Sequence, residues 1–326
     1  MSATPAELAP RPAAHPRWRS AAFGIAIEGS FEAPGLPAGE VPADAPRTRV
    51  EVVEAAAIEA RRRGPETRLL QEFFGKDETP ARSIDHLPGI GYRLYARHFG
   101  LAFVEEDGAR VLCAPPEDEP WSWQRFLVGR ILPWAAVLLG REIFHAGAVA
   151  IDGRAFALIG PSGAGKSSLV AQLVLRGAGF VGDDVLTIDE DLRAHPGTGI
   201  LCMRHAERAA MGGAAFARVG RLLGDSGKLY LEIEREPGPL PLGGFYFVAR
   251  GRPGEAAIEP LPAPDFRLLL GNTFNESIQS PQRLRRQFEL CAELAARVPM
   301  ARVHVQPGVS ARALAEAVHE HARSLP

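Results

Sequence analysis

The order of hydrophobic and polar positions predicts a chain in which strands and helices are mixed. Apolar residues run together over Arg154–Ile159 and Leu242–Arg250, a pattern typical of buried strands. They recur at helical spacing over Ser168–Arg176, Gln282–Arg297 and Ala311–Ser324, which predicts amphipathic helices. Because strands and helices alternate through the second half of the chain, we expect an α/β fold with a mixed sheet.

One of these helices, predicted over Gln282–Arg297, separates apolar from basic residues. Leu284, Phe288, Cys291 and Leu294 or Ala295 fall on one face, which we expect to pack against the core. Arg283 falls elsewhere on the helix and is expected to stay in solvent with the other arginines of this segment.

The first 120 residues predict a separate, smaller unit. Residues 1–19 are rich in Pro and Ala and are expected to be disordered. Residues 20–120 combine strand and helix patterns, so we predict a small N-terminal α/β module there. The Pro- and acid-rich stretch Ala114–Pro120 is the best linker candidate. Residues 121–326 would then form the larger domain.

Individual elements of the first half can also be predicted. Ala21–Glu28 alternates weakly, as a strand does, and Glu51–Arg63 has a helical pattern. Tyr92–Val104 and Ala109–Cys113 flank an acidic turn ending in Gly and predict a hairpin. Trp121–Leu139 predicts a helix that leads into the larger domain.

The strongest chemical signal is a glycine-rich run between the strand Arg154–Ile159 and the helix that follows it. Residues 160–167 fit the phosphate-binding pattern G-x-x-x-x-G-K-[ST], the P-loop or Walker A motif. In such a loop, backbone N–H groups and the helix N-terminus surround phosphate oxygens. Lys166 would reach the β- and γ-phosphates, and the Ser167 hydroxyl would ligate Mg²⁺. The sequence therefore predicts nucleotide binding, with ATP and Mg²⁺ as cofactors. The expected contacts are Gly160, Pro161, Ser162, Gly163, Ala164, Gly165, Lys166, Ser167 and Ser168.

Two carboxylates, Asp183 and Asp184, follow the strand expected at Phe180 and Val181. In a short β-α-β unit the second strand neighbours the first, so we expect its end to lie beside the loop. Paired acids in that place can divide two tasks, one holding Mg²⁺ and the other accepting a proton from an attacking hydroxyl. The alternative is a solvated Gly-Asp-Asp turn.

His145 opens the strand that precedes the loop's own strand. Asp152 and Gly153 between them predict a tight hairpin turn, so the two strands should pair. A lone histidine more often has a structural role, but its place beside the loop strand makes this one a candidate site residue.

A second acidic pair offers a competing interpretation. The apolar run that begins at Val185 ends in Asp189 and Glu190, the form of an ATPase magnesium strand in which Glu190 would activate water. The same residues fit a charged hairpin tip, and Asp189 lies about 16 Å of extended strand beyond Asp184. Both pairs therefore cannot face one phosphate, and we favour the hairpin. The chain also lacks the N-K-x-D element of guanine-specific switches and the L-S-G-G-Q run of transporter ATPases.

The stretch from Phe144 to Val185, F-H-A-G-A-V-A-I-D-G-R-A-F-A-L-I-G-P-S-G-A-G-K-S-S-L…G-A-G-F-V-G-D-D-V, resembles the core of the HPr kinase/phosphorylase-related proteins. It is similar, more distantly, to the nucleotide core of ATP-dependent phosphoenolpyruvate carboxykinases. In both, a histidine opens the strand before the loop, and an Asp-Asp pair follows the next strand. The resemblance is strong from about Glu142 to Asp189 and implies a P-loop core of HPr-kinase/carboxykinase type.

The resemblance also implies roles for single residues. It places Lys166 on phosphate, Ser167 on phosphate and Mg²⁺, and His145 near the transferred group. It places Asp183 and Asp184 on metal and substrate hydroxyl. We assign Asp184 as the base and Asp183 as the metal partner, with the opposite assignment left open.

The implied function is that of a kinase, a transferase that moves a phosphoryl group from ATP to a hydroxyl. The chain departs from HPr kinases because its nearest match to their downstream E-x-R-G-x-G signature, Glu232–Gly238, lacks the Arg-Gly step. Some relatives are similar to kinases that modify serine on ribosomally made peptides, so the expected acceptor is a serine of a peptide or protein. Two alternatives stay open: a nucleotide-gated regulator or slow ATPase, and a kinase of a small metabolite, which would need an enclosed pocket.

Composition agrees with a cytoplasmic enzyme. The net charge of −2, from 37 basic and 39 acidic residues, gives no electrostatic case for nucleic acid. Cys113, Cys202 and Cys291 are far apart and predict neither a metal site nor a disulfide. The longest apolar stretch, Ile131–Gly140, is too short to span a bilayer, and the N-terminus has no signal-peptide pattern. We expect no membrane span, and a homo-oligomer is compatible with the sequence.

Two cations downstream of the acidic pair could serve the same chemistry. Arg204, which follows a strand expected at Gly199–Leu201, could approach phosphate, and Lys228 could neutralise developing charge. For Arg204 a surface turn, and for Lys228 an edge-strand position, is the simpler interpretation. The triplet Arg61–Arg63 fits a solvated helix end.

Overall fold

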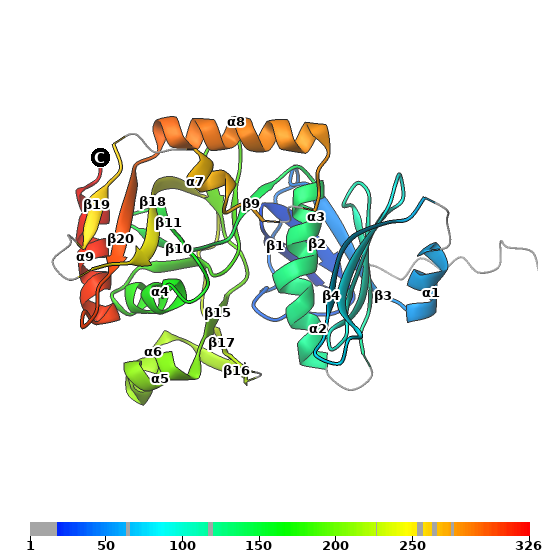
Figure 1. The fold of residues 1–326 in the computed structure, drawn as a ribbon, viewed down its shortest axis with the longest axis horizontal. Coiled ribbons are helices and arrows are strands. Elements are labelled where there is room, and N and C mark those ends of the chain that lie inside the picture. The colour runs from blue at the N-terminus through cyan, green and yellow to red at the C-terminus, as the bar shows by residue number, and fades with distance from the viewer. Residues whose placement is uncertain are drawn as a thin grey trace, which may run out of the picture.

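The computed structural model describes residues 18–62, 66–116, 120–225, 227–252, 257–262, 266–274 and 277–326. Two large sheets lie side by side, and a helix that connects them packs against the first sheet (Figure 1). Residues 1–17 of the predicted tail and residues 117–119 of the predicted linker lie outside the described ranges.

The first sheet has eight strands in the order β1-β2-β3-β8-β7-β6-β5-β4. Their bounds are β1 (Trp18–Ala22), β2 (Ile25–Gly29), β3 (Arg47–Val52), β4 (Arg68–Phe74), β5 (Pro80–Leu87), β6 (Gly91–Ala96), β7 (Gly100–Glu105) and β8 (Arg110–Ala114). Neighbours are antiparallel, except that β3 is parallel to both β2 and β8. Between β3 and β4 the chain forms α1 (Ala55–Glu59) and a 3₁₀ turn, η2 (Ala60–Arg62).

Several predicted elements of this region are divided or shortened in the structure. The predicted helix Glu51–Arg63 loses its start to β3, because the alternating residues Arg47–Val52 pair with β2 and β8. The predicted strand Ala21–Glu28 is two strands joined by a turn at Phe23 and Gly24, which have φ of 56° and 70°. Tyr92–Val104 divides in the same way into β6 and β7. Alternation continues through such tight turns, so the pattern alone does not reveal them. The β7–β8 hairpin is confirmed.

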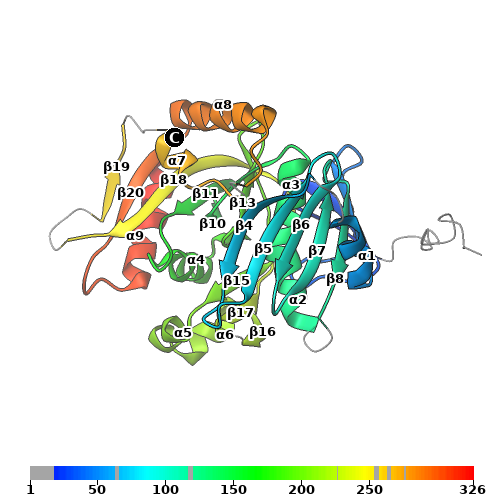
Figure 2. The same ribbon diagram turned by 45° about the vertical axis from the view of Figure 1, so that its right-hand side comes forward.

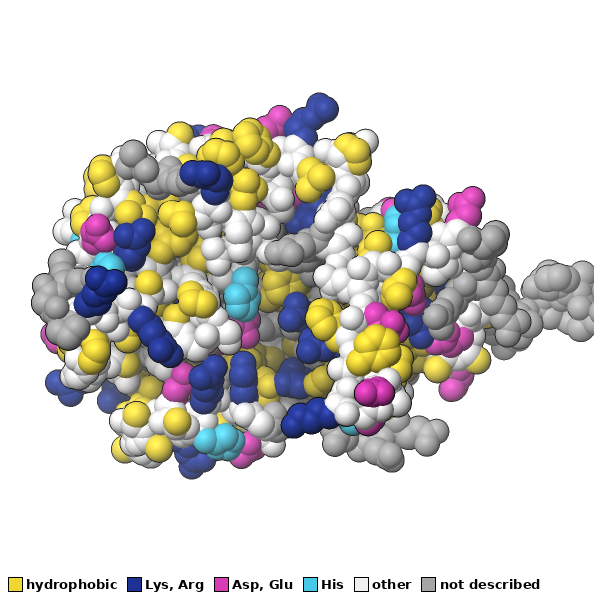
Figure 3. Space-filling model, in the orientation of Figure 1, with side chains coloured by type: hydrophobic (Ala, Val, Ile, Leu, Met, Phe, Trp, Pro, Cys, Tyr) yellow, Lys and Arg dark blue, Asp and Glu magenta, His cyan; other side chains and the backbone are white. Residues whose placement is uncertain are grey.

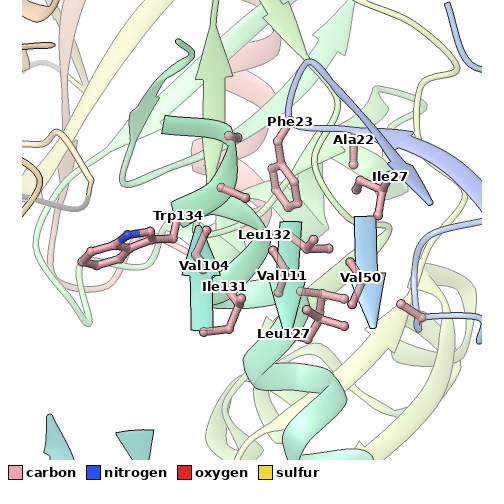
Figure 4. Close-up of a cluster of buried hydrophobic side chains, with 14 of the residues drawn as sticks. Ala22, Phe23, Ile27, Val50, Val104, Val111, Leu127, Ile131, Leu132 and Trp134 are labelled. Atoms are coloured by element: carbon pink, nitrogen blue, oxygen red, sulfur yellow. The ribbon is translucent and has the colours of Figure 1, made fainter. Parts of the chain in front are cut away.

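The predicted helix Trp121–Leu139 is confirmed, with a π-helical segment in its middle. It consists of α2 (Pro120–Phe126), η3 (Leu127–Ile131) and α3 (Leu132–Leu138). Figure 4 shows its apolar side chains, Leu127, Ile131 and Leu132 among them, against Val104 and Val111 of the first sheet. This burial fixes the helix on one face of the sheet.

The second sheet has nine strands. Seven follow the order β12-β10-β11-β18-β14-β13-β9, and β20 extends the sheet from β18 and pairs with β19. Their bounds are β9 (Glu142–Phe144), β10 (Ala146–Ile151), β11 (Arg154–Ile159), β12 (Gly179–Gly182), β13 (Leu186–Ile188), β14 (Arg193–His195), β18 (Leu240–Arg250), β19 (Ile258–Pro260) and β20 (Met300–Val305). The β11–β18 and β18–β20 pairs are parallel and the others antiparallel, so the expected mixed sheet is found.

A small sheet and six helices complete the described part of the chain. The small sheet has the order β15-β17-β16, with bounds β15 (Ile200–Met203), β16 (Arg221–Asp225) and β17 (Leu229–Glu232). The helices are α4 (Lys166–Leu175), α5 (His205–Met211), α6 (Gly213–Val219), α7 (Arg267–Leu270), α8 (Pro281–Arg297) and α9 (Ala311–Ser324). Within the described residues, no helix combines the length and the apolar character needed to cross a membrane.

The expected place of the strand that carries the acidic pair was wrong. β12 does not neighbour β11, because β10 lies between them and pairs with both. The Asp152-Gly153 turn folds β10 back onto β11 with Ile151 opposite Arg154, and this hairpin occupies the edge that a simple β-α-β unit would leave to β12. β12 therefore joins the sheet one strand further out.

The predicted packing face of α8 was also wrong in part. Cys291 and Leu294 are buried, but Leu284 and Phe288 are 45% and 51% exposed. Arg283 is only 3% exposed and donates hydrogen bonds to the carbonyl oxygens of Phe274 (2.8 Å) and Ile278 (2.7 Å). A guanidinium can enter the interior when carbonyl oxygens accept its hydrogen bonds and a carboxylate, here that of buried Glu142 at 3.5 Å, balances its charge. Helical spacing does not show this.

Candidate active site in a cleft between the two sheets

The glycine-rich run forms a tight loop between β11 and α4, as the motif requires. Gly160, Gly163 and Gly165 have φ of 158°, 82° and 97°, which side chains rarely allow. A Cβ atom on Gly160 would lie 2.4 Å from the carbonyl oxygen of Val248 on β18. The loop therefore turns directly against the neighbouring strand, and α4 begins at its end with Lys166.

Lys166 lies across this loop. Its Nζ donates hydrogen bonds to the carbonyl oxygens of Gly160 (2.7 Å) and Pro161 (3.4 Å), and the residue is 6% exposed. Burial lowers the pKa of Lys166, and the positive charge of Lys228 lowers it further, while Asp183 and Asp184 act in the opposite direction. A cation held in this way is placed to meet an anion that enters the loop.

Asp183 is buried against the first turn of α4. Its Oδ1 accepts a hydrogen bond from the Ser167 hydroxyl (3.1 Å), and its Oδ2 accepts one from the backbone N–H of Cys202 (2.9 Å). Burial and the neighbouring charge of Asp184 raise the pKa of Asp183 to about 7. Although β10 separates β12 from β11, the structure thus brings Ser167 and Asp183 into contact.

Asp184 and His145 meet at the mouth of the site. The Asp184 backbone is left-handed, with φ of 64°, and its carbonyl oxygen accepts a hydrogen bond from His145 Nδ1 (3.0 Å). Because a carbonyl can only accept, this bond assigns the proton to Nδ1 and leaves Nε2 unprotonated in the neutral ring. Burial lowers the pKa of His145, which favours that neutral form. Both residues line the same cleft.

The donor atoms beside the loop fit a hard divalent cation. The ligand atoms of Asp183, Asp184 and Cys202 lie within 4.8 Å of one another, and the Ser167 hydroxyl contacts Asp183. Carboxylate and hydroxyl oxygens are the donors that Mg²⁺ prefers. Burial and the two aspartates raise the pKa of Cys202 well above 9, so its thiol is protonated when no cation is bound.

The competing acidic pair forms a hairpin tip, as we favoured. β13 and β14 pair antiparallel on either side of it. Asp189 accepts hydrogen bonds from His195 Nε2 (2.7 Å) and from the backbone N–H of Arg193 (2.9 Å), and Glu190 is exposed. Neither acid lines the cleft that contains Asp184.

A cleft of about 1280 Å³ opens between the two large sheets. Asp183, Asp184 and His145 line one wall, and residues of β4, β5 and β6 with the connecting helix line the other. Figure 2 shows β4 and β5 on the side of the first sheet that faces the second sheet. The cleft thus joins the predicted site to the N-terminal region.

Basic side chains dominate the charged lining of the cleft. Figure 3 shows Lys and Arg side chains gathered in the hollow between the two parts of the molecule. The lining contains Lys76, Arg82, Arg97, Arg125, Arg130 and Lys228, against Asp77, Asp183 and Asp184. Sequence reasoning missed Arg82, Arg125 and Arg130. The available signal was that Arg125 and Arg130 interrupt an otherwise apolar helix pattern.

Two cations considered from the sequence do reach the site. The guanidinium of Arg204 lies over the loop, because a Cβ atom on Gly163 would be 3.3 Å from Arg204 Nη2. Lys228 lines the cleft. The interpretation of Arg204 as a surface turn residue was therefore incomplete, since the residue is exposed and also close to the loop.

Comparison with known proteins gives a distant structural resemblance. No protein-family model matches the chain, and no curated protein matches it. Among solved structures, 61 chains match. One is the Hpr(Ser) kinase/phosphatase from Coxiella burnetii, with a TM-score of 0.30 and 15% identity, over 56% of this chain and 90% of that chain. A likeness of this size does not place the chain in that family.

Proposed function

We propose that this protein is a kinase that transfers the γ-phosphoryl group of ATP to a hydroxyl group, with a serine of a peptide or protein as acceptor. The observation that carries the proposal is the contact between Ser167 at the start of α4 and buried Asp183, with Asp184 beside it on an open cleft. This arrangement supports the proposal because a glycine-rich loop, oxygen donors suited to a cation and a carboxylate lining the cleft lie within one small region.

The residues present fit Mg²⁺, which Ser167 and Asp183 would hold and which would neutralise charge on the phosphates. Lys166 would leave the carbonyl oxygens that it now contacts and bind the phosphate oxygens. Arg204, close to the loop, would contribute a second positive charge there.

The transfer itself needs one base. The acceptor oxygen forms a bond to the γ-phosphorus as the bond from that phosphorus to the bridging oxygen breaks, and ADP leaves. The acceptor's hydroxyl proton passes to Asp184. His145 holds the backbone of Asp184 through its Nδ1 hydrogen bond and would keep the carboxylate directed at the cleft.

The size of the cleft supports a polypeptide acceptor over a small metabolite. Pockets for small molecules usually measure about 300–1,000 Å³ and bury most of the ligand. The cleft here exceeds that range at about 1280 Å³ and has walls from two separate sheets. It has room for an extended segment of a chain.

The test is transfer of label from γ-labelled ATP, with Mg²⁺, into an extract of the source cells. Wild-type protein should label a discrete protein or peptide, and Asp184→Asn should not. Asn adopts the left-handed backbone of residue 184 readily, so this variant removes the carboxylate without straining the turn. Glu190→Gln on the exposed hairpin tip is the matched control and should label normally. Label released only as inorganic phosphate, kept by Asp184→Asn and lost by Glu190→Gln, would replace the kinase with a hydrolytic switch.

A further inference from the structure

The lining of the cleft is more basic than the chain as a whole. The chain has 37 basic and 39 acidic residues, whereas the cleft is lined by six Lys or Arg and three Asp. One of those aspartates, Asp77, is paired with Arg97 at 2.7 Å, and Asp183 is buried behind the loop. The solvent of the cleft is therefore faced mainly by positive charge.

Two of these cations, Arg82 and Arg130, belong to the first sheet and to the connecting helix. Arg82 comes from β5 and Arg130 from the π-helical segment η3, and both line the cleft with Asp184. Arg130 is exposed to the solvent of the cleft. Its pKa is nevertheless lowered, first because surrounding protein removes part of its hydration and then because Arg82 is close, while Asp184 acts in the opposite direction. The two guanidinium groups and Asp184 thus share one electrostatic environment.

The two arginines are supported by aromatic rings and not by acids. The guanidinium of Arg82 lies 5.6 Å from the ring centre of Phe73, and that of Arg130 lies 5.0 Å from the ring centre of Phe274. Among the described residues, no carboxylate lies within ion-pair distance of either arginine. Stacking on a ring orients a guanidinium and leaves its N–H groups free for a planar anion.

We propose that the acceptor is an acidic segment of a polypeptide, in which carboxylates next to the target hydroxyl bind Arg82 and Arg130. This inference rests on the proposed kinase function and specifies its substrate. Two arginines that line one cleft repel each other, and an Asp or Glu side chain bound to them relieves that repulsion with bidentate hydrogen bonds. The same two positive charges would repel a basic segment, so they would determine which acceptor binds as well as add to its affinity.

The experiment is labelling of a positional peptide library with a fixed central serine, using γ-labelled ATP and Mg²⁺. Wild-type protein should prefer Asp or Glu over Lys near the serine by about tenfold. Arg82→Gln and Arg130→Gln should each weaken this preference, and Arg82→Glu should reverse it toward Lys and Arg. Arg312→Glu, an equal charge change on the exposed start of α9, is the matched control and should leave the preference unchanged. Thermal melting confirms that each variant is folded.

The outcomes separate this inference from the kinase proposal. Selection of acidic residues by wild type, reversed by Arg82→Glu and kept by Arg312→Glu, supports it. Labelling with neutral or basic selection, or with the same selection in the folded Arg82→Glu variant, overturns it and leaves the kinase function standing. If neither the library nor the cell extract accepts label, the kinase proposal fails, and the acceptor inference fails with it.

Discussion

The two walls of the cleft carry opposite charges, and each holds its charged side chains in a different way. On one wall Asp183 is buried and held by hydrogen bonds from Ser167 and from the backbone of Cys202. On the other, Arg82 and Arg130 face the solvent of the cleft over aromatic rings, with no acid in contact among the described residues. Buried, bonded carboxylates are suited to a fixed task on a cation or proton, whereas stacked arginines in solvent are suited to an anion that comes and goes.

The largest expected effect lies on the acidic wall. Asp184→Asn should lower the rate of phosphoryl transfer by about a hundredfold or more, because the base is lost while the backbone conformation is kept. Transfer from γ-labelled ATP to a library peptide, measured at saturating substrates, gives this rate. A transfer rate within threefold of wild type would show that Asp184 is not the base.

The basic wall should respond in a different kinetic constant. Arg130→Gln should raise KM for an acidic peptide about tenfold and change kcat little, since the lost contact binds the acceptor before and during transfer. Steady-state kinetics with one acidic peptide and its Lys counterpart provides the measurement. A fall in kcat with unchanged KM would show that Arg130 acts on the transferring phosphoryl group and not on acceptor binding. The two walls would then not have separate roles.

Replacing Arg204 tests whether this arginine helps the loop to bind ATP. Arg204→Ala should weaken ATP binding by about threefold to tenfold, because its guanidinium lies over Gly163 without being buried. Binding of a fluorescent ATP analogue with Mg²⁺ measures this effect. Arg218→Ala, on exposed α6, is the control and should bind as wild type does. Equal affinity for the analogue in all three proteins would show that Arg204 does not contribute to ATP binding.

The smallest expected effect is on stability and concerns the second acidic pair. Burial would raise the pKa of Asp189, but hydrogen bonds from His195 and the backbone of Arg193 outweigh it and lower that pKa below its usual 3.8. The carboxylate therefore stabilises the fold above pH 3.8, and this contribution is lost as pH falls through the lower, folded-state pKa. Asp189→Asn should cost about 1–2 kcal/mol of unfolding free energy at pH 7 and less in acid.

Urea unfolding at neutral and acid pH measures the Asp189 effect. Asp191→Asn, on the same hairpin but exposed, should change the unfolding free energy by less than about 0.5 kcal/mol. A cost for Asp189→Asn that stays constant with pH would mean that the carboxylate charge does not carry the contribution.

The site could be predicted where its parts are close in sequence. The loop at 160–167 sets its own backbone through glycines, and the short α4–β12 passage leaves the chain little freedom to place Asp183 away from it. The strand order was predicted wrongly because the alternation of residues is the same whether β12 lies next to β11 or on the far side of β10. Arg82 and Arg130 could not be assigned, since their meeting with Asp184 depends on how one sheet packs against another. No local pattern encodes that packing.

One hydrophobic cluster contains buried residues from both walls of the cleft. Val185, the residue after Asp184, belongs to the same buried cluster as Phe23 of the first sheet and Trp134 of the connecting helix. Removing the first 120 residues would expose this apolar surface to water, so a shortened chain should aggregate. The two sheets should accordingly melt in one cooperative transition, and a substitution in this core, remote from the loop, would alter the proposed phosphoryl transfer by changing the width of the cleft.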